Sequence, residues 1–167
     1  QIIFLKELND FNLSRLEIRQ DNSGIKWGWN VDDVLKNNGF DKNISRTNIS
    51  LFDQLKGASL SVSTHNGTVP LETLALNFPT IIFWDMNHYQ LRKEASQKIS
   101  LLKEVGIFHD CPKKAALHIN DISNNISSWW YEENLQAALK EFTTEYALNA
   151  RDPIKVWQKF LSEEAAK

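Results

Sequence analysis

Two short β-prone runs, separated by a polar loop and a helical segment, constrain the fold more than any other feature. The runs Leu60–Thr64 and Thr80–Trp84 combine apolar and β-branched residues, as is typical of strands. Between them, residues 63–68 are polar and Val69–Asn77 has the character of a helix. Strands that alternate with helices are joined by right-handed crossovers. The pattern therefore predicts parallel strands in an α/β sheet covered on both faces.

The same periodicities predict further elements on both sides of this unit. Toward the N-terminus they predict helices at residues 2–8, 30–39 and 51–56, and strands at 15–19 and 44–49. Toward the C-terminus they predict a helix over 91–105, a short edge strand at 107–108, and helices at 115–122, 132–146 and 154–161. We therefore expect a Rossmann-like parallel sheet flanked by helices over residues 1–110, and an all-helical tail over 111–167.

Composition argues against several classes of partner. The 167-residue chain has a net charge of −2 and a pI near 6.1, which argues against a nucleic-acid or anionic-membrane partner, because binding to either would need a basic face. Its apolar runs are too short to cross a bilayer. The single cysteine, Cys111, excludes an internal disulfide and favours the reducing cytoplasm. We expect one domain over residues 1–167, which is a fragment of a longer protein because Gln1 opens on sequence typical of the middle of a domain.

The polar loop and the start of the next helix form the best candidate site. Thr68 suits the helix N-cap, Pro70 its first turn, and Glu72 the positive helix end. Backbone N–H groups and hydroxyls at such a point suit the phosphates of a nucleotide, and a carboxylate suits a ribose diol. The candidate nucleotide-binding residues are Ser63, Thr64, His65, Asn66, Gly67, Thr68 and Glu72. A well-capped connection without a ligand is the alternative.

Three further residues are candidates for weaker contacts with the same ligand. Arg19 ends one predicted strand, Asp85 follows another, and Arg92 lies at the start of the next helix. Ligands bind at the carboxyl ends of parallel strands, so the loops after Arg19, Thr64 and Trp84 would share one edge. The alternative is a capping aspartate and surface arginines. Trp27 and Trp29 could stack on a base or sugar, or cover the core.

The sequence contains no established catalytic or metal-binding motif. The four histidines lack partners at the spacings typical of metal ligands: His65, His88, His109 and His118. A nucleophile elbow, a Walker loop and a dinucleotide fingerprint are all missing. We therefore expect no bound metal or cofactor, and the sequence assigns no catalytic residue.

The chain also resembles a known family of transferases. The resemblance rests on the run Ser63-Thr64-x-Asn66-Gly67-Thr68-x-x-Leu71-Glu72-x-Leu74-Ala75-x-Asn77-x-Pro79, followed by Thr80–Trp84 and Asp85. It continues through Tyr89-x-Leu91-Arg92, Gly106-Ile107-Phe108, Ala115-Ala116, Trp129-Trp130 and Trp157, and more loosely through Arg19 and Gly28-Trp29. These residues are similar to the donor-binding half of GT-B transferases. They most resemble a bacterial surface-carbohydrate family related to capsule Kdo transferases and CDP-glycerol glycerophosphotransferases.

The resemblance implies a two-domain transferase of which this chain is the C-terminal, donor-binding domain. Glu72 would hold the ribose, and Asp85 and Arg92 would face the sugar or phosphate. The diphosphate or phosphate would be held by Ser63, Thr64, Asn66, Gly67 and Thr68. The donor would be a CMP-, CDP- or UDP-linked sugar or polyol. The catalytic base would belong to the missing N-terminal domain, so the fragment alone would be inactive. The alternatives are a nucleotide-sugar epimerase of GT-B architecture and a protein-interaction module that uses Trp129-Trp130.

Overall fold

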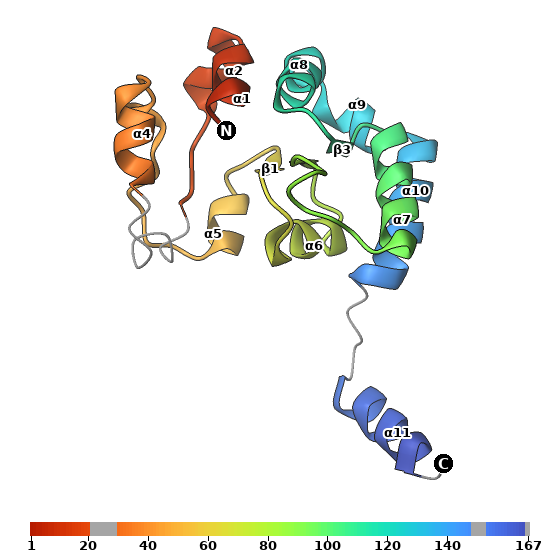
Figure 1. The fold of residues 1–167 in the computed structure, drawn as a ribbon. Coiled ribbons are helices and arrows are strands. Elements are labelled where there is room, and N and C mark those ends of the chain that lie inside the picture. Colours follow the sequence, from red (N-terminus) through yellow and green to blue (C-terminus); the bar gives the residue numbers. More distant parts are fainter. Residues whose placement is uncertain (21–29, 148–152, 166–167) are drawn as a thin grey trace.

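A parallel three-stranded sheet lies at the centre of the described structure (Figure 1). The computed structural model describes residues 1–20, 30–147 and 153–165. The strands are β1 (Ser61–Ser63), β2 (Thr80–Phe83) and β3 (Phe108–His109), in the order β1-β2-β3. Ser63 pairs with Ile82, which pairs in turn with Phe108. The predicted α/β class, parallel strands and edge position of the third strand are confirmed.

Helices cover both faces of this sheet. Figure 1 shows α1 (Ile2–Glu7) and α8 (Pro112–Ile122) on one side of the strands and α6 (Thr68–Ala75) on the other. The ring of Phe4 in α1 stacks on Phe83 at 4.8 Å between centroids. Because side chains alternate along a strand, Ile82 and Trp84 face the α6 side. All four residues of β2 are buried, as expected for a central parallel strand.

The C-terminal part of the described chain is helical, as predicted. Its helices are α7 (Lys93–Glu104) before β3, then α8, α9 (Ile126–Trp130), α10 (Glu133–Tyr146) and α11 (Pro153–Ala165). α7 packs against β3 and α10, and α10 also contacts α6. Trp130 of α9 is completely buried and Trp129 is 8% exposed. This pair therefore belongs to the core, which removes the exposed patch that the interaction-module alternative needed.

The N-terminal part departs from the predicted pattern. It contains α2 (Asp10–Arg15), α4 (Val31–Asn37), the 3₁₀ turn η1 (Asp41–Asn43) and α5 (Leu51–Leu55). The strands predicted at 15–19 and 44–49 are wrong: only an isolated parallel bridge joins Ile18 to Ile44. The buried side chain of Asn43 donates to the carbonyls of Leu13 and Leu16, at 2.7 and 3.0 Å. Residues 46–50 are exposed, so no buried strand can continue there.

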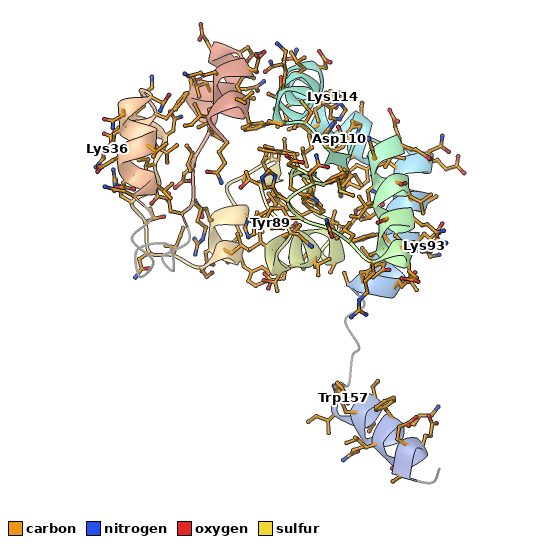
Figure 2. All side chains as sticks on the ribbon, in the orientation of Figure 1. Lys36, Tyr89, Lys93, Asp110, Lys114 and Trp157 are labelled. Carbon is orange, nitrogen blue, oxygen red and sulfur yellow. The ribbon has the colours of Figure 1, made fainter. Side chains whose placement is uncertain are left out.

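Two further observations concern the described helices: none is a candidate membrane span, and the last one is exposed. No helix in the described ranges is long and apolar enough to cross a membrane. α11 is amphipathic, and its described side chains from Ile154 to Ala165 are exposed, including Trp157 (Figure 2).

Candidate functional site

The carboxyl ends of β1 and β2 bring two polar loops to one edge of the sheet. Residues 64–67 follow β1, and residues 84–92 follow β2. The strands are parallel neighbours, and Ser63 lies opposite Ile82. Both loops therefore leave the sheet in the same direction and begin side by side, as the topology predicts for a ligand site.

Side-chain hydrogen bonds hold the first loop, residues 64–67, in its conformation. Ser63 is buried, and its hydroxyl donates to the carbonyl of His65 at 3.4 Å. The hydroxyl of Thr64 accepts a hydrogen bond from Gln1 Nε2 at 2.8 Å. A Cβ on Gly67 would lie only 2.7 Å from His65 Nε2. The imidazole of His65 therefore lies close against Gly67, and a larger residue at position 67 would displace this exposed ring.

This loop leads directly into the N-terminus of α6. Gly67, not Thr68, is the N-cap residue, so the predicted capping role of Thr68 is wrong. No side chain caps the helix, and Thr68, at its first position, is exposed. The free N–H groups of such a terminus carry partial positive charge and suit an anion. Glu72 is exposed one turn further along α6, without a side-chain partner in the described ranges.

The second loop begins with a turn around Asp85. One carboxylate oxygen, Oδ1, accepts from the backbone N–H of Asn87 at 2.8 Å, and Oδ2 lies 2.9 Å from Nδ1 of His88. The N–H of Asn87, followed by His88, lowers the pKa of Asp85 below its usual range, although partial desolvation opposes them. Asp85 is therefore a carboxylate at neutral pH.

Trp84 closes the end of β2 beneath this turn. It is 5% exposed and packs against Phe108 at 4.6 Å and against Tyr89 at 6.4 Å between ring centroids. Tyr89 itself lies on the second loop and is partly exposed (Figure 2). The indole N–H of Trp84 is buried without an acceptor among the described residues. A buried, unpaired donor of this kind costs free energy.

The two arginines predicted for this edge have different surroundings. Arg19 does not end a strand, and its guanidinium donates to the carbonyl of Ile49 at 2.9 Å and to Gln54 Oε1 at 3.0 Å. These bonds hold Arg19 against the start of α5. Arg92 is the exposed N-cap residue of α7 and follows the second loop, so it remains available to a ligand. Trp27, Gly28 and Trp29 lie outside the described residues.

Comparison with known proteins assigns the chain to a family. A family model described as LIC12162 family transferase matches residues 1–161. The chain belongs to this family. Neither the curated proteins nor the solved structures give a significant match. Membership of the LIC12162 family makes the chain part of a transferase family, consistent with the transferase resemblance of its sequence.

In this member of the LIC12162 family, sequence reasoning missed the contact between Asp85 and His88. The signal was present, because an aspartate and a histidine three residues apart follow a strand directly. A turn of this spacing lets the carboxylate reach the imidazole. Metal binding receives no support in the described ranges, where no three His, Cys, Asp or Glu residues are grouped closely enough to hold an ion.

Proposed function

We propose that this chain is the donor-nucleotide-binding domain of a GT-B-type transferase of surface polysaccharide biosynthesis. The observation that carries the proposal is the edge where residues 64–67 lead into the uncapped N-terminus of α6, beside the turn at Asp85. Membership of a transferase family over residues 1–161 supports it. Relationship to Kdo transferases and CDP-glycerol glycerophosphotransferases is part of the proposal.

In this proposal the donor's phosphates bind at the loop and helix terminus. The first N–H groups of α6, with the hydroxyls of Thr64 and Thr68, would donate to phosphate oxygens. The carboxylate of Glu72 would accept from the ribose diol. Arg92 would pair with a phosphate, because a guanidinium fork matches its geometry. Arg19 contributes less, since its guanidinium is occupied by residues 49 and 54.

Catalysis would then depend on position and electrostatics. A sugar or polyol phosphate is transferred when its bond to the nucleotide breaks and the leaving phosphate gains negative charge. Fixed N–H dipoles and a guanidinium stabilise that charge without a metal ion. The base that activates the acceptor would come from a second domain, and the reaction would take place in the cytoplasm.

Calorimetric titration of the chain with CMP, CDP, UDP and GDP tests the proposal. We expect saturable binding of one nucleotide, weakened by Thr68→Val. The matched control is Thr144→Val, which removes an exposed hydroxyl from α10, where it donates to the carbonyl of Lys140. Binding that neither variant changes would move the site elsewhere. Absence of binding to all four nucleotides would contradict the proposal for this chain.

A further inference from the structure

The contact between Asp85 and His88 fixes an imidazole on the loop after β2, which leaves the sheet at the same edge as the loop after β1. Nδ1 of His88 lies 2.9 Å from Oδ2 of Asp85. The side chain of His88 is 78% exposed, and its Nε2 has no partner among the described residues. A carboxylate that accepts from Nδ1–H selects the tautomer and orients the ring. The second ring nitrogen is therefore presented outward.

The pairing exceeds what the local turn requires. Oδ1 of Asp85 already accepts from the N–H of Asn87, and its carbonyl accepts from the N–H groups of His88 and Tyr89, at 3.0 and 3.1 Å. These bonds complete the turn without any side chain at position 88. Oδ2 contacts only the imidazole. Holding two exposed side chains in one geometry costs conformational entropy. This surplus contact points to a use for the imidazole.

The charges around this edge define what the imidazole can bind. Besides His88, the titratable and charged groups of the two loops and the adjoining helix starts are His65, Glu72, Asp85, Tyr89, Arg92, Lys93 and Glu94. A protonated His88 presents one N–H donor and one positive charge, which is the complement of a phosphate oxygen.

We infer that His88, oriented by Asp85, binds the phosphate of the donor nucleotide through Nε2–H. The inference rests on the proposed function and adds a specific ligand contact to it. His88 would touch the ligand, whereas Asp85 would be a positioning residue that acts through the imidazole. The ligand chemistry is a nucleoside mono- or diphosphate, and the contact is absent for a nucleoside without phosphate.

Calorimetry at about pH 6 and about pH 8 tests the inference, because a phosphate contact that needs a protonated imidazole weakens when the imidazole loses its proton. The ligands are the nucleotide that binds in the four-nucleotide panel and its nucleoside, and the variants are His88→Gln, Asp85→Asn and His65→Gln. We expect His88→Gln to weaken nucleotide binding about tenfold at the lower pH, the size of one charge-assisted hydrogen bond, and less at the higher pH. Nucleoside binding should not change. Asp85→Asn should act in the same direction with a smaller effect.

His65→Gln separates the two imidazoles of this edge. It should keep the pH-dependent component that His88→Gln removes. If the component is lost with His65→Gln instead, or if His88→Gln leaves nucleotide affinity unchanged at both pH values, the inference is overturned and the proposed function stands. If the parent chain binds no nucleotide at either pH, both fail together. Thermal unfolding of each variant confirms that it is folded, which the exposure of His88 favours.

Discussion

The indole N–H of Trp130 donates to both oxygens of Asn77, to the backbone oxygen at 3.1 Å and to the side-chain oxygen at 2.9 Å. Gln136 joins them, because its Nε2 donates to the carbonyl of Trp130 at 2.7 Å and to Asn77 Oδ1 at 3.2 Å. Asn77 follows the C-terminal end of α6, while Trp130 and Gln136 belong to α9 and α10. The network therefore fixes the far end of the helix whose N-terminus forms the candidate site.

Replacement of Trp130 should cost more stability than replacement of Trp84. Trp130→Phe removes both bonds to Asn77 and leaves a cavity, so we expect a loss of about 2–3 kcal/mol in the free energy of unfolding. Trp84→Phe removes a buried N–H that has no acceptor among the described residues, and the gain in free energy from its removal offsets part of the packing that is lost. We therefore expect a loss of about 1 kcal/mol or less in the free energy of unfolding. Chemical denaturation measures both. Equal or reversed costs would contradict the hydrogen-bond assignment.

At Asn77, glycine should be better tolerated than alanine. The residue has a φ of 52°, in the left-handed region that is unfavourable for alanine. Both substitutions lose the side-chain bonds, so their difference isolates the backbone, and we expect Asn77→Gly to be more stable by about 1 kcal/mol. Gln97, exposed within α7, provides the control, because there alanine should be the more stable by about 1 kcal/mol. The order at Asn77 should be the reverse of the order at Gln97 in the same denaturation assay.

Part of the structure could be predicted from the sequence and part could not. Short β-prone runs with a loop and helix between them were enough for β1, α6 and β2, because local patterns determine such units. The strands expected at 15–19 and 44–49 failed because a buried side chain, Asn43, binds the carbonyls of Leu13 in the last turn of α2 and of Leu16, its C-cap residue. These contacts join residues 30 and 27 positions apart in the sequence, so no local sequence pattern reveals them.

For the candidate site, topology was predictable and detailed geometry was not. Adjacent parallel strands placed the loops after Thr64 and Trp84 together, as expected. The N-cap was assigned to Thr68 from residue preference, but the ring of His65 lies against Gly67, which takes that position. Arg19 was expected at the same edge only because a strand was expected before it. The contact of His88 with Asp85 needed the turn geometry as well as the spacing.

Stability should fall at acidic pH through His109. Burial, and then the neighbouring His118 at 5.2 Å between ring centroids, lower the pKa of His109 from 6.5 to about 4. The native state keeps the ring neutral, while the unfolded chain takes up a proton below about pH 6.5. The contribution of His109 to the free energy of unfolding is therefore fully present above about pH 6.5, and it is lost as the pH falls toward 4. Since the ring is only half-buried, solvent screening reduces the loss to about 1–2 kcal/mol.

Urea denaturation across this pH range measures the effect. His109→Gln should reduce the pH dependence without abolishing it, because burial also lowers the pKa of His118, whereas His65→Gln, at an exposed ring, should leave it unchanged. Carboxylates also titrate near pH 4, so the difference between the parent chain and each variant is the relevant quantity. A parent chain and a His109→Gln variant with parallel curves would exclude His109 as the cause.

Glu72 should matter for binding far more than for folding. Its side chain is exposed without a partner in the described ranges, and it lies beyond the first turn of α6, so its interaction with the positive helix end contributes at most about 0.3–1 kcal/mol. Glu72→Ala should therefore lower the free energy of unfolding by no more than this amount. If the carboxylate accepts from a ribose diol, the same change should weaken nucleotide binding about tenfold. Glu133→Ala, in the first turn of α10, removes another exposed helix carboxylate away from the site and should leave affinity unchanged. A collapse of stability with intact affinity would make Glu72 structural, and the ribose contact would then have to come from another residue.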